Sequence, residues 1–207
     1  MKLSFMNLRF ISTSIVACIS AITITSCGGS GETTNSDSSA VSIDSATLAN
    51  RPNDTTRSEA EAMISGTVAD TAVTGTARFT SNQQTGKVTM TLNLEIPTKA
   101  NQTVAVHFHE HGDCGNKAEM AHGHWNPNNT NHGKWGEGSF HAGDIGNIKL
   151  DRQGKGSFTV ETDLWSIGGA PNKNIVGKSV IVHSGVDDYT TQPSGNSGSR
   201  IGCGVIQ

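Results

Sequence analysis

The sequence has few charged residues, few aromatic residues and few cysteines, and each shortage argues against a class of protein. Among 207 residues, 16% are charged, 5% are aromatic and four are Cys. Charge this sparse argues against a fully disordered chain, and four cysteines are too few for a small fold built from disulfides. The formal net charge of −3 argues against a broad basic surface, so we expect no nucleic-acid partner. The length favours one domain with appendages.

The N-terminal segment lacks an apolar run long enough for a comfortable membrane span. Lys2 and Arg9, with no acidic residue beside them, precede an apolar and hydroxyl-rich run from Phe10 to Thr25. A basic start followed by such a run is typical of an export signal. The run is too short and too rich in Ser and Thr to remain as a transmembrane helix. Residues 1–26 are therefore predicted to be a signal peptide.

The end of this signal, Ile24-Thr25-Ser26-Cys27, resembles the lipobox of bacterial lipoproteins, in which the cysteine is lipidated and becomes the mature N-terminus. A second match ending at Cys18 lies too close to the charged start of the chain. The alternative is an ordinary secretory signal in which Cys27 has no special role. The lipobox implies a periplasmic protein held to a membrane of the cell envelope by a lipid on Cys27. Gly29 stands where an Asp would resemble an inner-membrane retention signal, which favours the outer membrane.

Residues 27–60 are predicted to be a flexible linker, and residues 61–207 the folded domain. The stretch from Gly28 to Ala40 is mostly Gly, Ser, Thr, Asn and acid, and it cannot bury enough apolar area to offset the entropy of ordering. Cleavage of the signal leaves 13 basic and 18 acidic residues, a net charge of −5. The domain retains Cys114 and Cys203, and two cysteines in an exported domain suggest one disulfide.

Short β-strands dominate the predicted domain. Residues 87–96 alternate strictly between polar and apolar side chains, the pattern of a strand with one buried and one solvated face. The expected strands cover residues 63–68, 73–80, 87–96, 103–109, 145–150, 156–160, 179–183 and 202–206. Eight such strands with Gly-rich turns indicate an all-β antiparallel sandwich or barrel. No amphipathic helix is convincing, although residues 163–167 could form one helical turn.

Two long segments, 111–143 and 184–199, carry little strand pattern, and loops of this length in a compact domain are usually functional or disordered. Six of the eight His residues fall between positions 107 and 132, which a disordered loop would not explain. His107 and His109 are two apart on a predicted strand, so both point to one face at about 7 Å from each other. Paired imidazoles of this kind favour a copper or zinc site.

Five segments together resemble the copper/zinc superoxide dismutase family over about residues 63–207. They are His107 to Cys114, His124-Trp125-Asn126-Pro127, His141 to Asn147, Val182-His183 with Asp187-Asp188, and Gly195 to Ile206. The resemblance implies an eight-stranded Greek-key β-sandwich or barrel with two long loops, one metal-binding and one electrostatic. It also implies copper and zinc as cofactors and superoxide as the substrate.

The resemblance assigns a role to each matching residue. The copper ligands are expected to be His107, His109, His124 and His183. The zinc ligands are expected to be His124, His132, His141 and Asp144, so that His124 bridges the metals as an imidazolate and takes a proton in catalysis. Asp187 corresponds to an acid that links ligands of the two metals, Arg200 to an anion-binding catalytic group, and Cys114 with Cys203 to a disulfide. The implied function is dismutation of superoxide to dioxygen and hydrogen peroxide, through alternating reduction and oxidation of copper, as antioxidant defence in the cell envelope.

Some features stay open. His111 and His122 have no role in the family pattern; they could capture an additional metal ion, but we interpret them as exposed neutral side chains. The net charge of −5 repels superoxide at long range, so nearby cations must attract it; Lys117, Lys134 and Lys173 are candidates besides Arg200. The alternative function is an exported copper- or zinc-buffering protein on the same fold. No interface pattern decides between a monomer and a homodimer.

Overall fold

The computed structural model describes residues 57–207, where eight β-strands provide most of the regular structure. The strands are β1 (Glu59–Gly66), β2 (Thr74–Asn82), β3 (Lys87–Glu95), β4 (Thr103–His109), β5 (Gly146–Lys149), β6 (Lys155–Thr162), β7 (Ser179–His183) and β8 (Arg200–Val205). Two short 3-10 helices, η2 (Pro97–Lys99) and η3 (Glu119–Ala121), lie between strands. Within this part of the chain, no helix is long and apolar enough to cross a membrane. The predicted signal, Cys27 and most of the predicted linker lie outside the described residues.

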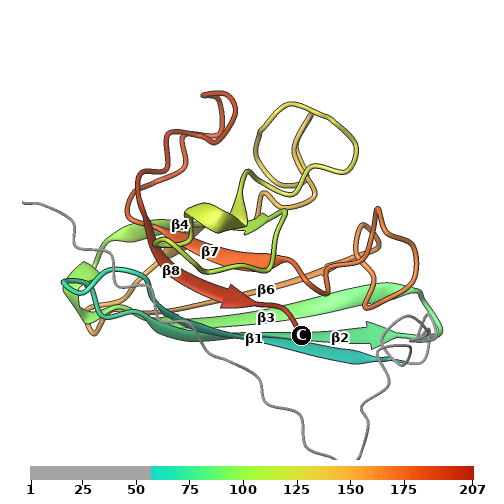
Figure 1. Ribbon diagram of the computed structural model, residues 1–207, viewed down its shortest axis with the longest axis horizontal. Helices are drawn as coiled ribbons and strands as arrows, with labels where there is room; N and C mark the ends of the chain where they lie inside the picture. Colours follow the sequence, from blue (N-terminus) through green and yellow to red (C-terminus); the bar gives the residue numbers. More distant parts are fainter. Residues whose placement is uncertain (1–56) are drawn as a thin grey trace, which may run out of the picture. The chain divides into compact units, whose positions relative to one another are not determined.

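The eight strands form one antiparallel sheet in the order β5-β4-β7-β8-β1-β2-β3-β6 (Figure 1). Strands distant in sequence are neighbours, since β3 pairs with β6 and β4 with β7, as in a Greek key. A tight turn joins the two outer strands, and in it the backbone amides of Gln153 and Lys155 both donate to the Asp151 carboxylate at 2.8 Å. The sheet thereby curls into a nearly closed barrel, which confirms the predicted fold class.

The alternation in β3 places one apolar face inside the barrel. Val88, Met90, Leu92 and Leu94 are all buried, and the polar residues between them face outward or are only partly covered. Burial of each such side chain stabilises the fold by about 1.5–3 kcal/mol. This strand ends one residue before the predicted boundary, and Ile96 continues the buried row beyond it.

The first strand begins earlier than predicted. β1 starts at Glu59, two residues before the expected domain boundary and four before the expected strand. Its buried row consists of Ala60, Ala62 and Ile64, while Met63 is 67% exposed. Alanine is a weak strand signal, so the alternation in this segment was missed. The helical turn considered for residues 163–167 is absent: Asp163, Leu164 and Ile167 form bends, and Ser166 bridges to Asn174.

Two long loops, residues 110–145 and 184–199, project from the same side of the barrel, next to β4, β7 and β8 (Figure 1). Gln192 joins them: its side-chain oxygen accepts the His132 amide at 2.9 Å, and its side-chain nitrogen donates to the His132 carbonyl at 3.0 Å. The predicted disulfide is present between Cys114 and Cys203, so it attaches the first loop to β8. Both loops are thus held close to the histidine-bearing strands.

Candidate metal centre

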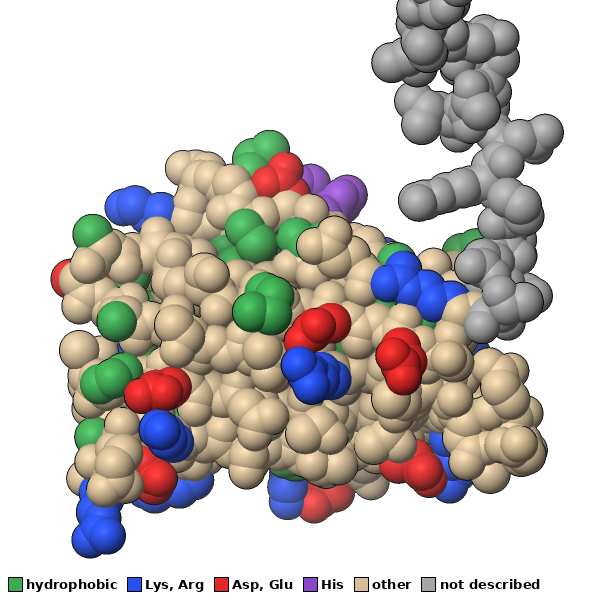
Figure 2. Space-filling model, turned by 90° about the horizontal axis from the view of Figure 1, so that it is seen from below, with side chains coloured by type: hydrophobic (Ala, Val, Ile, Leu, Met, Phe, Trp, Pro, Cys, Tyr) green, Lys and Arg blue, Asp and Glu red, His purple; other side chains and the backbone are tan. Residues whose placement is uncertain are grey.

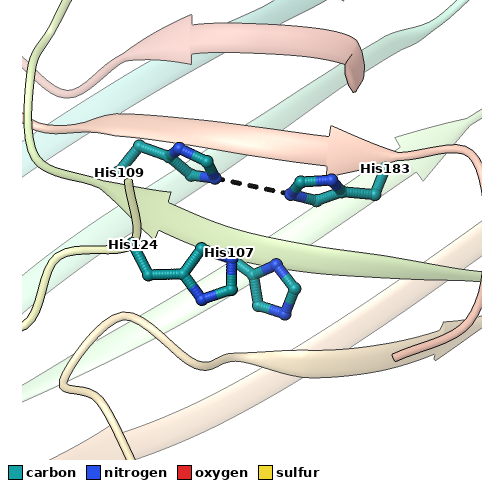
Figure 3. A group of neighbouring side chains, drawn as sticks. All are labelled: His107, His109, His124 and His183. Carbon is teal, nitrogen blue, oxygen red and sulfur yellow. Dashed lines mark hydrogen bonds between the residues drawn. The ribbon is translucent and has the colours of Figure 1, made fainter. Parts of the chain in front are cut away.

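Four histidines converge where the two loops meet the sheet (Figure 3). His107 and His109 are two apart on β4 and are both buried, and His183 ends the neighbouring strand β7. His124 lies in the first loop but forms an isolated antiparallel bridge with His109, which brings its ring to the same place. One ring nitrogen from each of these side chains lies within 4.8 Å of the others.

Each imidazole of this group has one nitrogen occupied elsewhere and one directed at the group. His109 donates through Nδ1 to the His122 carbonyl at 2.8 Å, and His183 through Nδ1 to the Gly198 carbonyl at 3.2 Å. If Nδ1 carries the proton in both rings, both Nε2 atoms are unprotonated. These two atoms nevertheless face each other at 3.4 Å (Figure 3). Two facing lone pairs need a cation between them.

His107 and His124 also have ring nitrogens that need a cation. Nδ1 of His107 and Nε2 of His124 are buried and have no hydrogen-bond partner. The two rings lie 4.0 Å apart between centroids. A buried polar atom without a partner costs about 1–3 kcal/mol. Together, the four histidines direct one imidazole nitrogen each to the same place, and four imidazole nitrogens are a donor set that fits copper.

A second cluster shares His124 and is built around the carboxylate of Asp144. Nδ1 of His124 lies 2.9 Å from Asp144 Oδ1, and Nδ1 of His141 lies 3.1 Å from the same oxygen. Nδ1 of His132 is 3.0 Å from Oδ2 but has no hydrogen-bond geometry there, so it too is unpartnered. Three imidazoles and one carboxylate, all buried, form the donor set of a closed zinc site. His124 contributes a different nitrogen to each cluster.

Asp187 links the two clusters from the second loop. Its Oδ2 accepts a hydrogen bond from His107 Nε2 at 2.8 Å, and its Oδ1 accepts one from His132 Nε2 at 2.9 Å. The carboxylate is itself held, because the Tyr189 amide donates to Oδ1 at 2.7 Å, and Asn147 hydrogen-bonds the Asp187 backbone. A carboxylate on the far nitrogen of an imidazole fixes the ring and makes the near nitrogen a stronger metal ligand.

Gly195 begins the last segment of the family resemblance, but no role in the centre was predicted for it. A side chain there would place Cβ 1.9 Å from Asp187 Oδ1 and 2.5 Å from His132 Nε2. Its φ of +66° is also a conformation that side-chain-bearing residues rarely adopt. The close approach of this backbone to the Asp187–His132 pair therefore requires glycine.

The buried imidazoles have strongly shifted pKa values. Burial lowers the pKa of His107, His109, His124 and His183, and it lowers that of His124 to about 4. Burial opposes protonation of His132 as well, but the adjacent carboxylates of Asp144 and Asp187 raise its pKa to about 9. The copper-type cluster thus stays neutral at pH 7, the form in which imidazole binds metals.

We expect the metal-free protein to lose stability as the pH falls from 7.5 to 5. In the unfolded chain, imidazole takes up a proton near pH 6.5, whereas folded His124 does so near pH 4, so below pH 6.5 the unfolded state binds more protons and is favoured. His132 acts in the opposite direction, because its contribution is complete below pH 6.5 and is lost only as the pH rises through 9. Four lowered imidazoles outweigh one raised one, and we expect Tm to fall by about 10 °C. Calorimetry of chelator-treated protein measures this; an equal or higher Tm at pH 5 would contradict it.

Comparison with known proteins agrees with this geometry. A family model described as copper/zinc superoxide dismutase (SODC) matches residues 73–206. The chain belongs to the copper/zinc superoxide dismutase family. The superoxide dismutases [Cu-Zn] of Yarrowia lipolytica and Podospora anserina are 34% and 35% identical to it over 143 residues, which is 66% of this chain and 91% of each relative. The extracellular superoxide dismutase [Cu-Zn] of Caenorhabditis elegans is 38% identical over 106 residues, 48% of this chain and 47% of that protein.

A solved structure has the same fold. The crystal structure of the clock protein EA4 superposes with a TM-score of 0.64 at 30% identity, and the match covers 73% of this chain and 95% of that one. Members of the copper/zinc superoxide dismutase family are oxidoreductases that use copper and zinc, and the two clusters described above supply donor sets for both metals.

A cavity of about 740 Å³ opens onto the copper-type cluster. His109, His124 and His183 line it together with Arg200. Arg200 begins β8 and is held by two loop carbonyls, since its guanidinium donates to Ala118 at 2.5 Å and to His122 at 2.7 Å. Among the described residues that line this cavity, Arg200 is the sole Lys or Arg.

The three lysines considered for attracting superoxide do not line this cavity. Lys134 is paired with Glu137 at 2.5 Å, and Lys173 donates to the Asp163 carbonyl at 2.9 Å. Lys117 is exposed.

Two tryptophans of the first loop pack into the core. Trp125 is buried in the main core, and Trp135 packs against Trp165 with ring centroids 5.1 Å apart.

Proposed function

We propose that this superoxide dismutase binds copper through His107, His109, His124 and His183, and zinc through His124, His132, His141 and Asp144. One observation carries the proposal: buried imidazole nitrogens gather inside the fold, with Nε2 of His109 facing Nε2 of His183 at 3.4 Å and with Nδ1 of His107 and Nε2 of His124 left without hydrogen-bond partners. Folding would not leave such atoms together unless a cation satisfied them.

In this proposal, copper supplies one-electron reduction and oxidation when bound, and zinc supplies fixed positive charge. His124 handles the proton, because its Nδ1 is held in the Asp144 cluster while its Nε2 is buried without a hydrogen-bond partner. That nitrogen takes up one proton after the first superoxide leaves as dioxygen. It returns the proton to the second superoxide, and with a second proton from solvent the product is hydrogen peroxide. Two superoxide anions and two protons thus yield one dioxygen and one hydrogen peroxide.

Arg200 is proposed to hold the superoxide anion. Its side chain is 18% exposed, its guanidinium is fixed by two carbonyls, and it lines the same cavity as His109, His124 and His183. A chain with net negative charge needs this kind of local cation, and a guanidinium fork suits a small anion. The same feature argues against the alternative function, since a metal-buffering protein has no use for an anion site beside its metal.

We expect Arg200→Ala to lower kcat/KM for superoxide by about 10- to 100-fold while the copper and zinc contents stay at wild-type levels. The loss follows from removal of the cavity's cation. Arg200→Lys should recover part of the rate and part of its dependence on ionic strength. Pulse radiolysis of the metal-loaded protein measures both.

The matched control is Arg78→Ala, which removes an exposed arginine on β2 that pairs with Glu61 at 3.0 Å. This variant should behave as wild type. The enzyme assignment of this site would be abandoned if the loaded wild-type protein consumed superoxide no faster than buffer; a buffering function would then account for the metals.

We further propose that the protein is exported and attached to a cell-envelope membrane by a lipid on Cys27, where it protects the envelope against superoxide. The support is the sequence pattern of residues 1–27 and the polar segment that follows it. Cys27→Ser should move the protein from the membrane fraction to the soluble periplasmic fraction. Cys18→Ser, the neighbouring cysteine in the signal, is the control and should leave it membrane-bound. Release in neither variant would rule out the anchor.

A further inference from the structure

Two histidines outside the metal centre form an exposed pair. His111 and His122 are the exposed histidines of residues 57–207; the other six are buried. Their ring centroids lie 4.2 Å apart at an interplanar angle of 44°. Figure 2 shows histidine side chains (purple) at the surface beside an acidic side chain. The centre itself uses neither residue.

The backbone places these two side chains opposite each other. Beyond β4, the chain continues antiparallel to residues 121–124, through the bridge between His109 and His124. The amide of Glu110 donates to the Gly123 carbonyl at 3.0 Å, and the amide of His111 to the Ala121 carbonyl at 3.1 Å. The second of these hydrogen bonds is one residue out of the regular antiparallel register, and this irregular pairing brings the His111 and His122 side chains together.

A carboxylate completes the group. One oxygen of Glu110 and one ring nitrogen from each of His111 and His122 all lie within 4.8 Å of one another. Two imidazoles and a carboxylate are ligands that Zn²⁺ and Cu²⁺ accept, with water in the remaining positions of an exposed site. We propose that Glu110, His111 and His122 form an accessory, solvent-accessible site for a divalent transition-metal ion, distinct from the seven residues of the buried centre.

The backbone of His122 supports this assignment. Its φ of 63° and ψ of −144° belong to a region that glycine adopts readily and other residues adopt at a cost. The side chain is exposed, so it does not recover that cost through core packing. Binding of a metal ion by His122, His111 and Glu110 would offset the free-energy cost of this backbone conformation.

The site also adjoins the buried centre through one peptide group. The carbonyl of His122 accepts the Nδ1 proton of His109 at 2.8 Å and a guanidinium proton of Arg200 at 2.7 Å. An ion on the His122 side chain is therefore connected, through the backbone of His122 alone, to the proposed copper ligand His109 and to the proposed anion-binding group of Arg200.

The test is a count of metal ions on the full-length protein already loaded with copper and zinc. Calorimetric titration with Zn²⁺ should reveal one additional equivalent per chain. His111→Ala and His122→Gly should each weaken that binding by about 10- to 100-fold or more, and Glu110→Gln should weaken it less. Glu161→Gln, an exposed acid on β6 paired with Lys87, is the matched control and should bind as wild type. His122→Gly should also raise Tm, because glycine relieves the backbone.

A second measurement needs no variant. Diethyl pyrocarbonate labels exposed imidazoles, so mass spectrometry of the loaded wild-type protein should find label on His111 and His122. One equivalent of Zn²⁺ should suppress both labels together. The proposal is overturned if no additional equivalent binds, if it binds equally well to both histidine variants, or if zinc leaves the labelling unchanged.

Discussion

His124→Ala is expected to abolish superoxide consumption by the copper- and zinc-loaded protein, with a fall of at least about 1000-fold in kcat/KM. This side chain is common to both clusters: its Nδ1 lies 2.9 Å from Asp144, and its Nε2 is buried and unpartnered on the side of His107. Its removal takes one ligand from each proposed metal site and also the nitrogen proposed to carry the proton. No other imidazole contributes to both clusters.

Two comparison variants separate these effects. His132→Ala removes a ligand from the zinc-type cluster alone, so it should lower zinc content while copper content and a measurable rate remain. Asn128→Ala changes an exposed residue of the same loop and should match wild type in rate and metal content. Retention of more than about a tenth of the wild-type rate by His124→Ala would show that this residue neither bridges nor transfers the proton.

Removal of the disulfide is expected to cost about 4–5 kcal/mol of stability, because it closes a long loop in the unfolded chain. Cys114 and Cys203 are 89 positions apart, and their bond attaches the first loop to β8. For Cys114→Ser combined with Cys203→Ser, we expect Tm to fall by about 10–20 °C. Because Arg200 on β8 donates to Ala118 and His122 of that loop, the variant should also show a lower kcat/KM for superoxide.

Differential scanning calorimetry under non-oxidising and oxidising conditions checks this expectation. Wild-type protein treated with reductant should melt where the double variant melts, and reductant should not change the melting of the variant. A double variant with the wild-type Tm would mean that the loop is held by its other contacts alone.

The parts of the fold that the sequence predicted well are those with strong alternation of large residues. Val88, Met90, Leu92 and Leu94 define β3 within one residue of its end, and the pattern from 103 to 109 gives β4 with its bounds. β1 was placed too late because its buried face is made of Ala60 and Ala62, whose small side chains give a weak periodic signal.

The site residues were assigned through the resemblance to the family, and their arrangement in space could not be predicted. His107 and His109 on one strand predict a shared face, but the place of His124 beside them depends on an isolated bridge within a loop. The same irregular pairing sets His111 opposite His122, which no local pattern indicates. Gly195 was missed because its requirement arises from tertiary contacts with Asp187 and His132, which are far from it in sequence or lie across the loop.

The carboxylate of Asp187 has a thermodynamic consequence for the two clusters. One oxygen accepts from His107 and the other from His132, so a change in charge on either ring alters the electron density available to the other. Binding at one cluster then changes the affinity of the other, and the size of that change is a coupling free energy between the two clusters. Linkage requires that energy to be the same in both directions: by whatever factor bound zinc changes the affinity for copper, bound copper changes the affinity for zinc.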